Sequence, residues 1–113
     1  MQLETKKYLY DIQQAAARIA EFTAEKKFED YRNNRMLRAA VERQFEIIGE
    51  ALSQLARLDE VLAERISGHR RIIAFRNILI HGYADVDDRL GWDVVQGKLP
   101  VLRREIEALL AGD

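Results

Sequence analysis

The chain of 113 residues carries 18 lysine and arginine side chains against 19 aspartate and glutamate side chains, with one proline and no cysteine. This length predicts a single domain over residues 1–113, and the lack of cysteine excludes a disulfide framework and thiolate zinc sites. A formal net charge of −1 excludes a globally basic protein that binds nucleic acid by bulk attraction. No apolar run is long enough for a membrane span and the start lacks a signal peptide pattern, so we expect a cytoplasmic protein.

The first half of the chain has the apolar spacing of amphipathic helices and no strand pattern. One stripe predicts a helix over residues 3–24 and another predicts a helix over residues 34–57, joined by a polar turn over residues 25–33. The stripes are Tyr8, Ile12, Ala15, Ile19 and Phe22, then Leu37, Val41, Phe45, Ile48, Leu52 and Leu55. A short helix is expected over residues 59–66, with Asp59 as its N-cap and Gly68 at its end.

The second half of the chain predicts two further helices. The helix over residues 69–81 is apolar nearly all round, which indicates a central place in the packing or an interface, and Gly82 is expected as its left-handed end. The last helix covers residues 88–110, with a kink expected between Gln96 and Pro100, and Trp92 is expected in the core or in a dimer seam. The predicted fold class is all-α, an up-and-down bundle of four main helices plus one short helix.

Charge is unevenly distributed along the chain. Residues 65–84 hold four arginines and both histidines with no acidic residue, which leaves 14 basic against 19 acidic residues elsewhere. A dimer that joins two such windows would concentrate positive potential at one cleft, so we expect modest, salt-dependent affinity for nucleic acid.

Arg76 and Asn77 are the only polar residues between Ile72 and Ile80. Since burying an unpaired guanidinium is costly, Arg76 must either pair with an acid, Glu46 or Glu50, or face a wet cleft that uses its charge. Both interpretations are open at this point.

His81 closes the same helix, four residues after Asn77 and five after Arg76, which places it about 140° around the helix from Arg76. An imidazole can transfer protons and a guanidinium can hold a phosphate, a pair that suits RNA cleavage by the ribose 2′-hydroxyl without a metal. His69 lies about 18 Å back along the helix and cannot share the site. A two-fold dimer that joined two copies of His81 would supply both base and acid.

The segment RNILIHGY at residues 76–83 resembles the signature of HepT-like proteins in the HEPN superfamily. LYDIQQAAARIAEF at residues 9–22, AVERQFEIIGEAL at 40–52 and WDVVQGKLPVLRREI at 92–106 resemble further blocks of that family in the same order. The likeness therefore covers essentially the whole chain.

The resemblance implies a homodimeric, metal-independent endoribonuclease without a cofactor, the toxin of a prokaryotic type VII toxin–antitoxin pair. Arg76 and His81 match the catalytic residues, and Asn77 matches a residue that orders the site. Tyr83 matches the tyrosine that a minimal nucleotidyltransferase antitoxin of the MntA type modifies with AMP. Whether the dimer forms a larger assembly with this antitoxin is left open by the sequence.

Other polar residues receive weaker assignments. Glu46 and Glu50 are expected to orient Arg76. Arg70 and Arg71 are expected to guide the RNA backbone, and His69 is expected to be solvated at the surface. Two alternatives stay open. In one, a catalytically weak HEPN module binds RNA or serves as a subunit of a nucleotidyltransferase; in the other, a purely structural dimer keeps Arg76 as a core ion pair closed to solvent.

Overall fold

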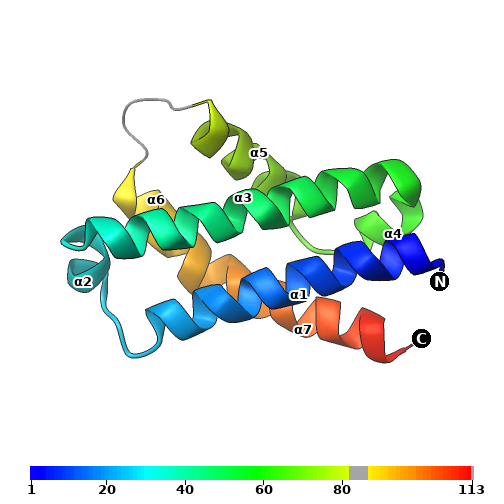
Figure 1. Cartoon of the computed structure of the whole chain (residues 1–113), viewed down its shortest axis with the longest axis horizontal. Coiled ribbons are helices and arrows are strands. Elements are labelled where there is room, and N and C mark those ends of the chain that lie inside the picture. The colour runs from blue at the N-terminus through cyan, green and yellow to red at the C-terminus, as the bar shows by residue number, and fades with distance from the viewer. Residues whose placement is uncertain (82–86, 113) are drawn as a thin grey trace.

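The fold is built on an antiparallel pair of long helices, α1 (Leu3–Thr23) and α3 (Arg35–Leu58), as the computed structural model shows (Figure 1). The structure describes residues 1–81 and 87–112. Helix α5 (His69–Ile80) packs on α3, and α7 (Leu99–Ala111) packs on α1. The described residues form helices without any strand, so the predicted all-α bundle is confirmed. Among these helices none is long and apolar enough to cross a membrane.

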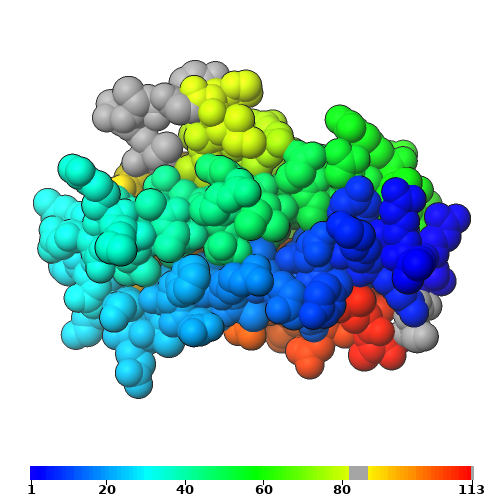
Figure 2. Space-filling model, in the orientation of Figure 1, coloured from blue at the N-terminus to red at the C-terminus, as the bar shows by residue number. Residues whose placement is uncertain are grey.

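The predicted apolar stripes form the core where α1 and α3 meet. All six stripe residues of α3 are buried, whereas on α1 the end members Tyr8 and Phe22 are only half-buried. Leu9 and Ala16, which the predicted stripe did not include, are buried. Figure 2 shows the side chains of α1 and α3 packed together along the front face. The edge position of Tyr8 leaves its ring available to a neighbouring cavity.

Side-chain caps begin α3 and α4 (Glu60–Glu64), and the cap at Asp59 is the one that the sequence predicts. The side chain of Asn34 accepts a hydrogen bond from the Leu37 N–H (3.0 Å), and that of Asp59 accepts one from the Leu62 N–H (3.0 Å) at the start of α4. Gly68 does not end α4 directly; it adopts a left-handed conformation (φ 70°) immediately before α5. It thereby sets the direction in which the chain enters α5.

Residues 25–33 are not only a polar turn, as predicted, because they contain the one-turn helix α2 (Phe28–Arg32). Tyr31 of α2 is buried, and its ring centroid lies 5.4 Å from that of Trp92 in α6 (Asp88–Asp93). Trp92 thus belongs to the core of the chain. A single turn cannot display an apolar period, so the sequence pattern gave no sign of this helix.

The last predicted helix is divided into three pieces. After α6 come a π-helical turn, η1 (Val94–Lys98), and then α7. The Leu99 N–H bonds to the carbonyl of Val94, five residues back, and Pro100 falls in the first turn of α7, where a missing N–H is tolerated. The irregular turn thus precedes Pro100 and overlaps the stretch where a kink was predicted.

Helix α5 contributes less to the core than its apolar sequence predicts. Ile72 and Phe75 are buried, and Phe75 meets Phe45 of α3 edge to face at 5.4 Å between ring centroids. Ala74 and Ile80 are exposed. Apolar side chains on more than one side of α5 are therefore left outside the core of the single chain.

An ion-pair junction joins the start of α3 to α2 and α6. Arg38 donates to the carbonyl of Tyr31 (3.3 Å) and pairs with Asp88 (3.4 Å). Burial, reinforced by the charges of Asp88 and Glu46 and opposed by Arg38, raises the pKa of Glu42 beside this junction. Burial likewise raises the pKa of the Tyr31 phenol.

We expect Glu42→Gln to stabilise the protein near neutral pH. Because the pKa of Glu42 is higher in the folded state, its proton favours folding at low pH, and this contribution is lost as the pH rises through the folded-state value. The melting temperature of Glu42→Gln should exceed that of the parent at about pH 7 and match it below the ordinary glutamate pKa. Glu21→Gln, on an exposed part of α1, is the matched control. Equal melting temperatures of parent and Glu42→Gln across this range would contradict the assignment.

Candidate active site

A cavity of about 300 Å³ opens between α1, α3 and α5. Helix α1 contributes one aromatic ring and one carboxylate, α3 two carboxylates and one guanidinium, and α5 the guanidinium singled out in the sequence. The residues that line the cavity are Tyr8, Asp11, Arg43, Glu46, Ile47, Glu50, Ala51, Arg76 and Ile80. Arg76 therefore faces a water-accessible space and pairs with an acid at the same time, which joins the two interpretations that the sequence left open.

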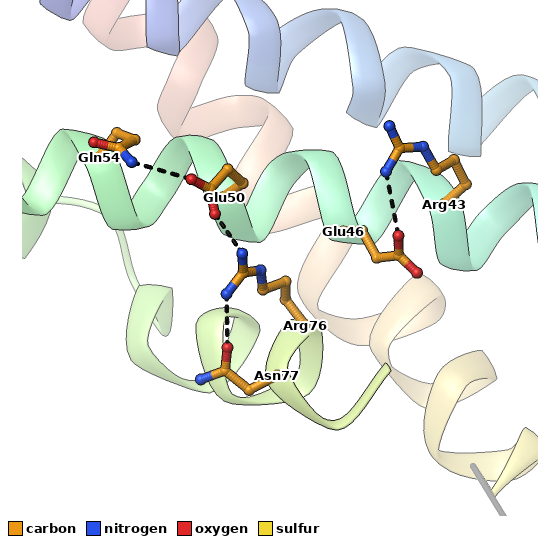
Figure 3. A network of polar contacts seen from close by, with 6 residues as sticks. All are labelled: Arg43, Glu46, Glu50, Gln54, Arg76 and Asn77. Carbon is orange, nitrogen blue, oxygen red and sulfur yellow. Dashed lines mark hydrogen bonds and ion pairs between the residues drawn. The ribbon is translucent and has the colours of Figure 1, made fainter. Parts of the chain in front are cut away.

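The guanidinium of Arg76 is held by one residue on each side. One terminal nitrogen forms an ion pair with Glu50, and the other donates to Oδ1 of Asn77 (2.9 Å), as Figure 3 shows. Glu50 accepts a further hydrogen bond from Gln54 (3.0 Å). The Arg76 side chain is 24% exposed, and its Nε is buried without a hydrogen-bond partner among the described residues. The head group is thus fixed in orientation while part of it stays open to the cavity.

The stem of Arg76 lies directly against the backbone of Gly49. A Cβ atom placed on Gly49 would lie 2.3 Å from the Cβ and 2.6 Å from the Cγ of Arg76, far inside van der Waals contact. These atoms are close to the α5 backbone and cannot move without it. A glycine in the middle of a long helix costs up to about 1 kcal/mol relative to alanine, and this close approach of α5 to α3 is its physical explanation.

The two predicted positioning carboxylates have different partners. Glu50 contacts Arg76, whereas Glu46 pairs with Arg43 (3.2 Å) one turn earlier on α3 (Figure 3). Both line the cavity. Residues 65–84 contain no acid, which predicts a strongly positive environment for Arg76. The environment is less positive than that, because α1 and α3 place acidic side chains in the same cavity.

His81 lies at the C-terminal end of α5 and is exposed. Its backbone is still helical, and its N–H bonds to the carbonyl of Asn77 (3.0 Å), so the last turn does not unwind before this residue. Arg76 and His81 are therefore both open to solvent, contrary to the purely structural interpretation. Gly82 and Tyr83 lie outside the described residues.

The remaining polar residues of α5 lie outside the cavity of Arg76. Arg70 pairs with Glu64, and Arg71 lines a separate groove between α5 and the α6–η1 segment. The expectation that His69 is solvated is wrong: it is 6% exposed, and its Nδ1 lies 3.2 Å from the carbonyl oxygen of Ile66. Ser67 donates twice to Glu105 (2.9 and 2.7 Å), which ties the turn before His69 to α7.

Sequence reasoning missed four residues of this site: Tyr8, Asp11, Arg43 and Gly49. Tyr8 is a member of a predicted apolar stripe, and Asp11 and Arg43 lie beside the stripes, so none of the three stands out in the sequence as a site residue. Gly49 had a signal, because a lone glycine inside a strong helical pattern indicates close packing. Among the described residues no group of three or more histidine and acidic side chains is placed to hold a metal ion.

We expect Gly49→Ala to lower the free energy of unfolding by about 1–3 kcal/mol, the usual cost of overpacking. Gly97→Ala is the matched control, because a Cβ there meets nothing within 4 Å. That substitution should be neutral or stabilising, since alanine is the better helix former. Chemical denaturation of both variants measures the difference, and a Gly49→Ala protein as stable as its parent would contradict the packing described.

Comparison with known proteins places this chain in a family. A family model described as Ribonuclease HepT-like matches residues 12–109. The chain is 38% identical over 109 residues to the "Probable ribonuclease HepT" of Thermococcus cleftensis, covering 96% of this chain and 98% of that relative. It is 35% identical over 106 residues to a protein of Methanocaldococcus jannaschii named "Putative RNase MJ1380", covering 92% of this chain and 94% of that relative. No solved structure shows a significant match. The chain belongs to the HepT-like ribonucleases of the HEPN superfamily, and the endoribonuclease class predicted from its sequence is confirmed.

Proposed function

We propose that this protein is a metal-independent endoribonuclease toxin of a type VII toxin–antitoxin pair. The observation that carries the proposal is the state of Arg76, a guanidinium fixed by Glu50 and Asn77 at a water-accessible cavity, on the helix that ends at the exposed His81. Membership of a ribonuclease family supports the reaction class.

The proposed reaction needs only proton transfer and charge stabilisation. A neutral His81 takes the proton of a ribose 2′-hydroxyl, whose oxygen bonds to the adjacent phosphorus. The bond from phosphorus to the 5′-oxygen breaks, and a protonated His81 gives its proton to that leaving oxygen. The products are a 2′,3′-cyclic phosphate and a 5′-hydroxyl end.

Arg76 is suited to hold the scissile phosphate. A guanidinium has five N–H donors, and Glu50 and Asn77 engage its two terminal nitrogens without using all of them. Those that remain can bind phosphate oxygens and stabilise the negative charge of the pentavalent transition state. Fixing the guanidinium beforehand reduces the reorganisation needed during the reaction.

The reaction also supports a homodimer, because one chain has a single histidine at this site. The outer face of α5 borders an apolar groove of about 360 Å³, lined in part by Ala74, Ile78, Leu90 and Val94. Leu90 is a large apolar residue of this groove, and it is 42% exposed. Covering this face with a second copy would bury it and bring two copies of His81 toward one two-fold axis.

We expect His81→Ala to reduce RNA cleavage by about 10²–10⁴-fold and Arg76→Ala by about 10²–10³-fold, the usual effects of losing an acid–base group and a charge-stabilising donor. The measurement is cleavage of RNA by purified protein in chelator, with end-group analysis for the 2′,3′-cyclic phosphate. Both variants should also lose growth toxicity.

Fold and assembly serve as controls for these two variants. The helix content of both variants should equal that of the parent, and the molar mass in solution should stay at twice the chain mass. Arg76→Ala should keep its fold because Glu50 is 49% exposed and stays solvated without Arg76. Full activity of both variants would refute the catalytic assignment. A parent protein that binds RNA and yields no cyclic phosphate would favour the RNA-binding or partner-subunit alternative.

We further propose that a nucleotidyltransferase antitoxin silences the toxin by adding AMP to Tyr83. Phosphates two residues from His81 would put negative charge and bulk where the RNA phosphate binds. Intact mass after incubation with ATP and the neighbouring nucleotidyltransferase should rise by whole AMP units, with loss of RNA cleavage. Tyr83→Phe should gain no mass; the same gain in that variant would remove Tyr83 from the proposal.

A further inference from the structure

The cavity extends beyond Arg76 to a wall formed by α1. Tyr8 and Asp11 stand three residues apart on α1, so they are neighbours on the helix surface, and both line the cavity. Ile47 and Ala51 of α3 supply apolar surface next to them. The proposed cleavage reaction uses none of these four residues.

The charge of this wall disfavours a second phosphate. The charged groups that line the cavity are three carboxylates and two guanidinium groups, and each guanidinium is already paired with a carboxylate from the same cavity. Phosphates beyond the one at Arg76 would meet negative charge. A flat, uncharged group with N–H donors suits an aromatic ring, apolar side chains and a free carboxylate oxygen.

Building on the proposed function, we infer that this wall binds the nucleobase beside the scissile phosphate and prefers guanine. The ring of Tyr8 supports the plane of the base, and the carboxylate of Asp11 accepts hydrogen bonds from its Watson–Crick edge. A volume of about 300 Å³ is at the lower end of the range for small-ligand pockets, as a single nucleotide requires.

Hydrogen-bond chemistry selects guanine among the four bases. Guanine presents an imino N–H and an amino N–H side by side, which match the two oxygens of one carboxylate. Adenine and cytosine present an amino group beside a ring nitrogen that repels the carboxylate. The N–H of uracil lies between two carbonyl oxygens, so uracil should bind worst.

The local contacts of Asp11 leave it able to take this role. Its Oδ2 pairs with Lys7 (3.2 Å), and among the described residues its other oxygen has no hydrogen-bond partner. Lys7 also lies 5.3 Å from the centre of the Tyr8 ring. Since the Lys7 side chain is 68% exposed, a base can displace it at little cost.

The test is binding of the four nucleoside 3′,5′-bisphosphates to the whole protein. These probes carry one phosphate on the 3′ oxygen and one on the 5′ oxygen of the ribose. Neither phosphate is a diester, so binding is measured without cleavage. Guanosine bisphosphate should bind roughly tenfold more tightly than uridine bisphosphate, within the discrimination expected of a good bidentate contact. Inosine bisphosphate, which lacks the amino group, should bind with intermediate affinity.

Variants assign the preference to its residues. Asp11→Asn should bind guanosine and uridine bisphosphates equally, because the amide offers one acceptor where the carboxylate offers two. Tyr8→Leu should lower the affinity for all four probes about tenfold through loss of stacking, whereas Tyr8→Phe should leave it unchanged. Glu29→Gln removes one carboxylate from an exposed ion pair outside the cavity and should keep the parent's preference.

The outcomes separate this inference from the proposed function. Equal affinity of the parent for guanosine and uridine bisphosphates, or a preference that Asp11→Asn retains, would overturn the base subsite even if RNA is cleaved. A guanine preference that Asp11→Asn abolishes would support the subsite. Absence of cyclic phosphate from RNA would count against the nuclease whatever the binding data show.

Discussion

The close approach of α5 to α3 at Gly49 is the constraint on which the site depends. Because Gly49 has no side chain, the stem of Arg76 lies against the α3 backbone, and its guanidinium meets Glu50, the next residue of α3. One missing methyl group thus sets both the distance between two helices and the position of the charge. The arginine then remains on an otherwise apolar helix because its head reaches an acid and water, which avoids the cost of an isolated buried charge.

The site combines positive and negative groups more closely than a phosphate-binding surface would. Residues 65–84 contain no acidic residue, yet Asp11, Glu46 and Glu50 line the same cavity as Arg76. This arrangement limits bulk attraction for polyanions and leaves specificity to a few directed contacts. It agrees with a protein whose formal net charge is −1 and whose action on RNA is proposed to depend on one phosphate and one base.

Helices supply the residues that line the cavity, and His81 directly follows α5. α1 and α3 carry the cavity walls, and their shared core holds these walls at fixed separation. At the other end of α3, Arg38 and the Tyr31–Trp92 contact fasten α2 and α6. Helix α6 therefore starts from a fixed point after the segment that follows His81. A site built on packed helices keeps its geometry better than one built on loops.

The sequence by itself determined the helices, most of their limits and the Arg76–His81 motif, because apolar periodicity, caps and motif spacing are local properties of the chain. Local pattern could not reveal α2, which is a single turn, or the burial of His69, which depends on a turn tied to α7. Nor could it choose between Glu46 and Glu50 as the partner of Arg76. Tertiary structure decided that choice, and it brought Tyr8 and Asp11 to the cavity. Contacts between helices depend on how closely their backbones pack, and between α3 and α5 Gly49 sets that distance.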